Sequence, residues 1–150
     1  MKRVTHPDRR MWRHLSIALA LGAGVGFALP AAASVSQLPM AQHEGKVTYL
    51  SGGIGEREAK AMQEAAPKYP LEVEFIKKEP SGPAAYLAND KVAIRDRAGK
   101  TVLSTTSTGP FLLAKLPPGR YTVMATNNKA SKARKIDLAA GKHEKLVFEW

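Results

Sequence analysis

A rigid turn that leads directly into a strand is the feature that most constrains the fold of this chain. Residues 116–123 read LPPGRYTV. Pro118 fixes φ near the value required at the first central position of a type I or type II turn, and Gly119 accepts positive φ at the second. From Tyr121 onward every second side chain is apolar, which is the period of a strand with one buried face. We therefore expect Pro117, Pro118, Gly119 and Tyr121 to form a structural turn, a hairpin corner without a ligand role.

Short segments of strand composition follow one another along most of the chain, with turn residues between them. Two alternating segments around the sequence RAGK predict a hairpin, and Asn127-Asn128 marks another turn. Short strands at regular spacing are typical of an antiparallel β-sandwich, which is the fold we expect. The expected strands are residues 46–50, 71–76, 91–96, 101–106, 111–115, 121–125, 133–138 and 145–150.

One helix is expected near residues 56–66, EREAKAMQEAA, because this segment is rich in strong helix formers and Pro67 follows it. Its apolar stripe, with Met62 near the centre, predicts that it packs on a sheet; the stripe comprises Ile54, Ala59, Met62 and Ala66. The expected fold class is thus mainly β, an antiparallel sandwich with one additional N-terminal α-helix.

Residues 1–33 have the order of a secretory signal peptide. A basic beginning is followed by the apolar run LSIALALGAGVGFAL and then by PAAA, whose small residues signal peptidase accepts. Cleavage between Ala33 and Ser34 would make the protein periplasmic or secreted, with residues 34–45 as a flexible leader and 46–150 as one domain. A retained membrane anchor is the alternative, although the run is shorter than the ~20 residues of a spanning helix. Membrane contact is therefore expected only through an uncleaved signal.

Charge and composition exclude several function classes. Beyond residue 33 the chain holds 18 basic and 12 acidic residues, a moderate excess that favours anionic envelope components. Acids and bases interleave from residue 46 and no aromatic platform accompanies them, so nucleic acid is not an expected partner. The chain has no cysteine, which excludes thiol chemistry and cysteine-ligated zinc.

Two stretches of the sequence contain residues that an acidic or phosphate-binding site could use. The GGIG turn before the helix lacks the spacing of a phosphate loop, and Glu56 and Glu58 would repel an anion there. The same turn, residues 52–58, is the place where a hydrolase site would lie if the protein were an enzyme. Glu72 and Glu74 share one strand face, but acid catalysis requires a shielded carboxyl, so we expect a solvated face.

Two histidines and two aromatic residues are the remaining candidates for a metal site or a ligand contact. A metal site formed by His43 and His143 would require the two ends of the domain to meet, so we expect two separate, solvated histidines. Phe111 and Trp150 are candidate ligand contacts for a sugar, although strand alternation favours a core position for Trp150. No catalytic residue, cofactor or metal ligand is expected.

The second half of the chain, residues 88–150, resembles the carboxypeptidase regulatory-like domains of the transthyretin-like, carbohydrate-binding-like sandwich group. The resemblance lies in the pattern V-x-I-x-D-x-x-G-x-x-V from Val92, in Gly109-Pro110, and in residues 116–123. It implies a sandwich and little about function. Residues 49–75 look like the front half of small exported proteobacterial proteins that have no assigned activity. The helix departs from the family pattern, which begins directly with strands.

The sequence therefore predicts an exported, non-enzymatic binding or interaction module of the periplasm or cell envelope. Its expected partner is an envelope protein or polysaccharide. A carbohydrate-binding domain is the first alternative, which the resemblance implies, and a hydrolase is the second.

The signal peptide predicts a mature chain that begins at Ser34. Mass spectrometry of the protein recovered from its native host should give the mass of residues 34–150, because signal peptidase cuts after the small-x-small sequence. An intact Met1 would contradict the prediction and would place the protein at the membrane.

Overall fold

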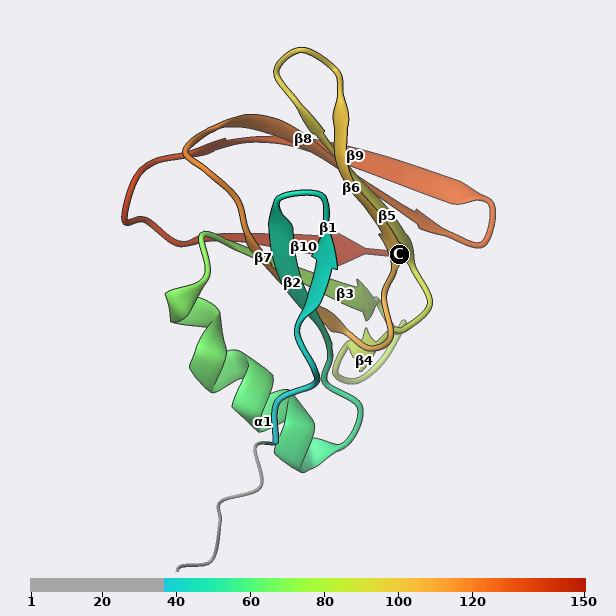
Figure 1. Ribbon diagram of the computed structural model, residues 1–150. Helices are drawn as coiled ribbons and strands as arrows, with labels where there is room; N and C mark the ends of the chain where they lie inside the picture. Colours follow the sequence, from blue (N-terminus) through green and yellow to red (C-terminus); the bar gives the residue numbers. More distant parts are fainter. Residues whose placement is uncertain (1–36) are drawn as a thin grey trace, which may run out of the picture. The chain divides into compact units, whose positions relative to one another are not determined.

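A computed structural model describes residues 37–150, so the expected signal peptide at residues 1–33 lies outside the described residues. The chain forms two β-sheets, one α-helix and a short 3₁₀ turn, and it is mainly β (Figure 1). The elements in order are β1 Gln42–Glu44, β2 Val47–Gly52, α1 Glu56–Ala65, η1 Ala66–Lys68, β3 Leu71–Lys77, β4 Ala85–Tyr86, β5 Lys91–Asp96, β6 Thr101–Thr106, β7 Phe111–Lys115, β8 Gly119–Asn127, β9 Ala130–Leu138 and β10 Glu144–Glu149.

The six-stranded sheet has the order β1-β2-β7-β3-β10, with β4 paired to β3 beyond this path. All its pairs are antiparallel except β3–β10, which is parallel, with Lys145 opposite Glu72 and Phe148 opposite Phe75. The expectation of a wholly antiparallel fold is therefore wrong at this pair. The last two strands, β9 and β10, follow each other along the chain but belong to different sheets.

The four-stranded sheet has the order β6-β5-β8-β9 and is antiparallel throughout. Its two hairpins, β5–β6 and β8–β9, confirm the pairings expected around RAGK and Asn127-Asn128. Asp96 stabilises the first turn, because its Oδ1 accepts hydrogen bonds from the backbone N–H groups of Ala98, at 2.9 Å, and Lys100, at 3.0 Å. Asn128 adopts a positive φ of 51° in the second turn, a conformation that asparagine tolerates better than most residues.

One hydrophobic core lies between the two sheets and draws side chains from both. Alternation along each strand sends every second residue to this core, as Val92 and Ile94 of β5 show. The rings of Phe75 and Phe148 stack with centroids 6.2 Å apart, which packs the parallel pair against the core. The other principal members are Val47, Tyr49, Leu71, Val73, Leu103, Leu112, Ala114, Tyr121, Val123, Ala125 and Leu138.

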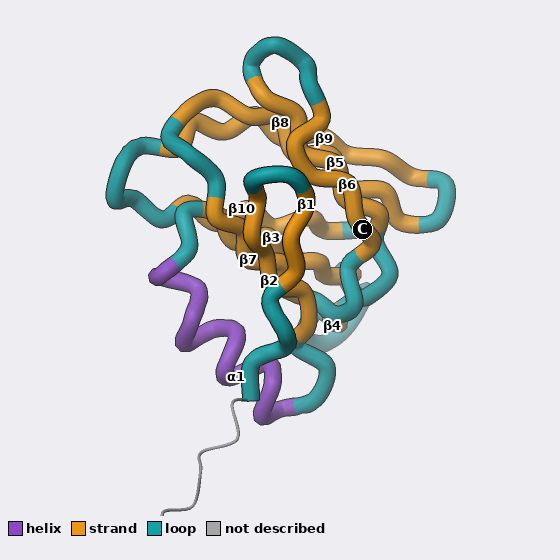
Figure 2. Tube along the Cα trace, in the orientation of Figure 1, coloured by secondary structure: helices purple, strands orange, loops and turns teal. Residues whose placement is uncertain are grey.

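The helix packs on the other face of the six-stranded sheet, as expected, but it is not N-terminal. It follows β2 and precedes β3 (Figure 2). Met62 is fully buried against Leu50 and Phe111, and burial of such a side chain contributes about 1.5–3 kcal/mol. Ile54, placed in the apolar stripe by the sequence, is instead 65% exposed. Across residues 37–150, the structure has no helix with the length and apolar character that crossing a bilayer requires.

Part of the segment expected as a flexible leader is a strand. Gln42–Glu44 form β1, which pairs with β2 at the edge of the six-stranded sheet. The carboxylate of Glu44 accepts hydrogen bonds at 3.0 Å from the N–H of Ser104 in β6. This contact satisfies a backbone donor of an edge strand and ties the edges of the two sheets together.

The segment LPPGRYTV is a corner between the two sheets. Strand β7 belongs to the six-stranded sheet and β8 to the four-stranded sheet, so the expected hairpin at this point is wrong. Two prolines carry the chain across, and the hydroxyl of Tyr121 donates a hydrogen bond of 2.8 Å to the carbonyl oxygen of Pro117. Gly119 opens β8 with a φ of 155°, a value that residues with a side chain rarely adopt. The residues expected to be structural therefore hold the crossing between the sheets.

Gly119→Val should destabilise the protein. Because valine does not tolerate the backbone conformation of Gly119, we expect a loss of about 1–3 kcal/mol in the free energy of unfolding and a lower thermal midpoint. Thr122→Val, an isosteric change on the outer side of the same strand, is the control and should shift stability by no more than about 0.5 kcal/mol. Equal midpoints for Gly119→Val and wild type would mean that the corner does not hold the fold.

Candidate functional site

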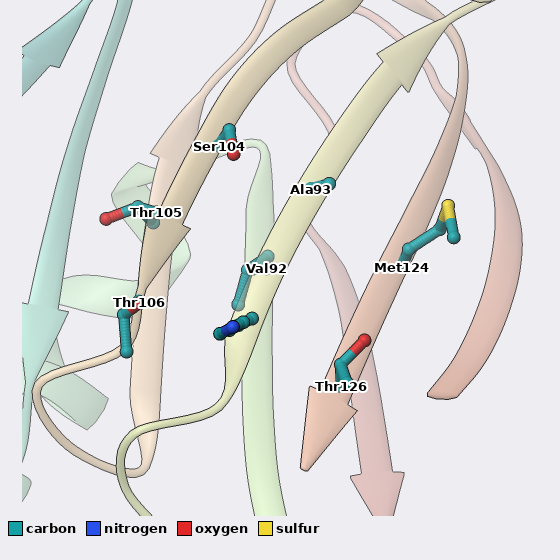
Figure 3. A pocket seen from close by; sticks show the side chains of 8 residues that line it. Val92, Ala93, Ser104, Thr105, Thr106, Met124 and Thr126 are labelled. Carbon is teal, nitrogen blue, oxygen red and sulfur yellow. The ribbon is translucent and has the colours of Figure 1, made fainter. Parts of the chain in front are cut away.

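The outer face of the four-stranded sheet is the first candidate site. The registers align outward side chains in rows across the strands: Thr106, Lys91, Thr126 and Ser131 form one row, and Ser104, Ala93, Met124 and Ala133 form the next. The small side chains of Ser104 and Ala93 leave a hollow of about 260 Å³ over β6, β5 and β8, with Met124 at its side (Figure 3). The floor is therefore shallow and bears hydroxyl groups, suited to contact with an extended ligand.

A second hollow lies beside the corner. It has a volume of about 490 Å³, and its lining includes Tyr121, Asp96 and Arg120. Burial, with the negative charge of Asp96 as the smaller cause, raises the pKa of the Tyr121 hydroxyl above its ordinary value. That hydroxyl is already bonded to the Pro117 carbonyl, and Arg120 faces Asp137 at 3.5 Å. The polar groups at this hollow are thus engaged in holding the corner.

A cluster of four charged or polar side chains, with a buried carboxyl group at its centre, lies where β3 and β10 begin. Glu72 is only 5% exposed, so the expectation of a solvated strand face is wrong for this residue. One carboxylate oxygen of Glu72 lies 3.2 Å from Lys145 Nζ, and the other lies 3.1 Å from His143 Nε2. Lys145 also reaches Glu74 at 2.6 Å. The cluster joins the two strands of the parallel pair through opposite charges.

Further contacts hold the side chains of His143 and Lys145 in this cluster. His143 Nδ1 lies 2.8 Å from the Tyr69 carbonyl oxygen, which only accepts hydrogen bonds. The Nε2 atom of the same ring reaches Glu72, so the contact with Tyr69 orients the imidazole toward this carboxylate. Partial burial opposes the charge on Lys145, but hydrogen bonds and charges from Glu74 and Glu72 outweigh it and raise the pKa of Lys145. The ammonium group of Lys145 thus lies between the carboxyl groups of Glu72 and Glu74.

Asp90 is a buried acid of a different kind. It is 0% exposed, and among residues 37–150 neither of its carboxylate oxygens has a hydrogen-bond partner. Burial raises the pKa of the Asp90 carboxyl above its ordinary value of 3.8, although the nearby side chains of Asn127 and Trp150 act in the opposite direction without meeting hydrogen-bond geometry. The backbone of Asp90 is well held, since it exchanges hydrogen bonds with Ser107. Ionisation of Asp90 therefore opposes folding.

The two aromatic candidates do not share a platform. Phe111 is 1% exposed and lies under the helix, in the cluster with Met62. Trp150 packs against the core between the sheets, as strand alternation indicated, and Lys132 Nζ lies 5.2 Å from the centroid of its ring. Phe111 therefore has no surface to offer a sugar, and the two rings lie on opposite faces of the six-stranded sheet.

The glycine-rich turn before the helix has a packing role. The backbone N–H of Gly53 donates a hydrogen bond of 2.7 Å to Glu58 Oε1, so this carboxylate satisfies the turn. A side chain at Gly109 would collide with the backbone of Gly52, which explains the small residues at this approach. Glu56 is exposed, and a hollow of about 660 Å³ lies over this turn. The two carboxylates are thus not brought together as a shielded pair.

The histidines lie apart, as expected, but neither is purely solvated. His43 Nδ1 lies 3.0 Å from Thr48 Oγ1 on the neighbouring strand, and His143 belongs to the cluster with Glu72. In the part of the chain that the structure describes, no group of three or more histidine or acidic side chains is placed to hold a metal ion. Sequence reasoning missed the partnership of His143 and Glu72 because they lie 71 positions apart.

Comparisons with known proteins assign no family. No family model matches the chain, and no curated protein matches it. Among solved structures, the Bacillus anthracis TIE protein is similar at 20% identity with a TM-score of 0.40, over 53% of this chain and 16% of that chain. The matched part is therefore less than a fifth of that protein's length.

Asp90→Asn should stabilise the protein at neutral pH. The native state of the wild type retains the Asp90 proton to higher pH than the unfolded chain, so its stability should decrease as pH rises from about 4 through the raised pKa. The substitution removes this ionisation, and we expect a gain of about 1 kcal/mol at pH 7 that disappears below pH 4. Urea unfolding at pH 3.5 and pH 7 measures both values.

The exposed Asp137 provides the control. Asp137→Asn should show no comparable gain at pH 7, because its side chain is in solvent. If Asp90→Asn were no more stable than wild type at pH 7, the buried carboxyl would have a partner that satisfies its charge.

Proposed function

We propose that the protein is an exported, non-enzymatic binding module of the periplasm or cell envelope, and that it binds through the outer face of the four-stranded sheet. The observation that carries the proposal is the exposure of this face. The two sheets cover each other, and α1 covers part of the remaining face of the six-stranded sheet. Within residues 37–150 no element packs over the outer face, so its hollow is open to a partner.

The finer architecture belongs to the same proposal. We take the two sheets as a β-sandwich of the transthyretin-like type, related to the carboxypeptidase regulatory-like domains. The core shared by both sheets supports a sandwich. The hydrogen bond from Tyr121 to Pro117 supports it too, since a tyrosine that bonds the backbone a few residues upstream is a recurrent device of sandwich corners.

The absence of catalysis is proposed from the way acidic groups are used. Glu72 and Glu74 face cations, and Glu58 accepts a backbone hydrogen bond. A general acid or base needs a carboxyl held ready for a substrate, whereas these three carboxyls are occupied by contacts within the fold. The export of the protein rests on the signal-like pattern of residues 1–33.

Binding to the envelope can be tested by co-sedimentation. The purified protein should sediment with an isolated envelope fraction, and Met124→Arg should reduce the bound fraction several-fold because a large side chain then fills the hollow. Arginine adds a positive charge, which would strengthen the attraction of an anionic partner, so a loss of binding would be steric.

Val147→Arg is the matched control, because Val147 is 39% exposed on a strand of the other sheet. It should leave sedimentation unchanged. Equal binding of wild type and Met124→Arg, or no binding by wild type, would contradict the proposed function.

A further inference from the structure

Basic residues are concentrated in the part of the chain that builds the four-stranded sheet. Residues 91–138 hold ten basic and two acidic residues, whereas the rest of residues 37–150 holds eight basic and ten acidic residues. The whole excess of positive charge therefore belongs to one segment. Apart from Lys115 of β7, these cations lie on β5, β8 and β9 or in the hairpin turns, so the fold gathers most of the charge on the four-stranded layer.

The outer face carries cations on both sides of the uncharged row formed by Ser104, Ala93, Met124 and Ala133. Lys91 belongs to the row on one side, and Arg95 with Lys135 belongs to the row on the other, aligned through Thr122. Lys91 and Arg95 stand four residues apart on one strand, which separates them by about 13 Å. All three cations are exposed, and none has an ion-pair partner among the described residues. The row of Ser104, Ala93, Met124 and Ala133 is thus an uncharged floor, and the rows on its two sides, which carry the cations, are its margins.

The floor and margins also bear hydroxyl groups. Ser104, Thr106 and Thr126 line the hollow and both donate and accept hydrogen bonds. Thr126 Oγ1 and Ser131 Oγ lie 2.8 Å apart at one margin. Cations beside hydroxyl groups match a partner that carries anionic groups and many hydroxyls of its own.

The face lacks the features that a bilayer or a nucleic acid would use. The large apolar side chains that are exposed in the described residues, Met40, Ile54, Tyr86 and Val147, all lie outside its four strands, whereas a membrane-bound surface combines cations with inserted apolar groups. Tyr121 is the one aromatic residue in these strands, and it points into the core. Bases of single-stranded nucleic acids stack on exposed aromatic rings, which this face does not offer.

We infer that the outer face of the four-stranded sheet binds an anionic polysaccharide, whose carboxylate or sulfate groups contact Lys91, Arg95 and Lys135 while its sugar hydroxyls contact the hydroxyl-lined floor. This inference rests on the proposed function and names the partner of the same face. The attraction is electrostatic, so salt weakens it.

The test measures binding of the purified protein to immobilised alginate and heparin, with neutral dextran as the uncharged polymer. We expect binding to both anionic polymers and none to dextran, with affinity about tenfold lower at 500 mM than at 50 mM NaCl. The face variant combines Lys91→Gln, Arg95→Gln and Lys135→Gln. Its affinity should fall at least about tenfold, because it removes the charge of both margins.

The control variant removes the same net charge elsewhere by Lys46→Gln, Lys68→Gln and Lys142→Gln, all at exposed positions outside the four-stranded sheet. Its affinity should fall by about twofold at most. Thermal midpoints of both variants should match wild type, since these side chains lie in solvent.

The inference is overturned if wild type binds neither polymer, if both variants lose affinity equally, or if the protein binds only vesicles of anionic phospholipid or single-stranded DNA. Envelope co-sedimentation that is lost in Met124→Arg without any polysaccharide binding would overturn this inference and leave the proposed function standing. Absence of both kinds of binding would overturn the two together.

Discussion

Strand β7 is buried on both faces, and the arrangement of the other elements follows from covering it. Leu112 and Ala114 enter the core between the sheets, while Phe111 and Leu113 face the helix. A strand buried in this way reads as a continuous apolar run, FLLA, without alternation. The sequence must then supply one cover for each face, and it does so with the helix on one side and the four-stranded sheet on the other. The corner after β7 carries the chain directly into that second cover.

The sequence predicts best where structure is set locally. The hairpin around RAGK and the helix that ends near Pro67 depend on turn chemistry and on helix propensity within a few residues, and both form as expected. The corner residues were identified, but their role as a crossing between sheets was not, because a turn does not specify which sheet the following strand joins. Likewise β10 satisfies the alternation of a strand, while its parallel partner β3 lies about 70 positions upstream, a pairing that local pattern cannot reveal.

The candidate sites show the same limit. Alternating acidic residues on β3 indicate a solvated face, and that inference fails for Glu72 because β10 brings Lys145 and His143 over it. An ion pair of this kind compensates the cost of removing a carboxylate from water, so a charged residue can occupy a position that patterning assigns to solvent. Asp90 shows the converse, since its burial has no such compensation among the described residues. The excess of basic residues in 91–138 is visible in the sequence, but a net charge summed over the whole domain does not show that it lies in this segment.

The charged side chains of the two layers have different partners, and this difference distinguishes the outer face of the four-stranded sheet. In the six-stranded sheet and the helix turn, acidic side chains serve the fold: Glu44 satisfies β6, Glu58 satisfies the glycine turn, and Glu72 joins β3 to β10. On the outer face of the four-stranded sheet, Lys91, Arg95 and Lys135 have no such task, and Asp137 of the neighbouring row faces Arg120. Surface charges interact over about 10 Å at moderate ionic strength, so Lys91 on one side of the hollow and Arg95 with Lys135 on the other form two positive regions. Because none of these three cations has an ion-pair partner among the described residues, their charge is available to an anionic partner. The uncharged row between them determines where that partner can lie.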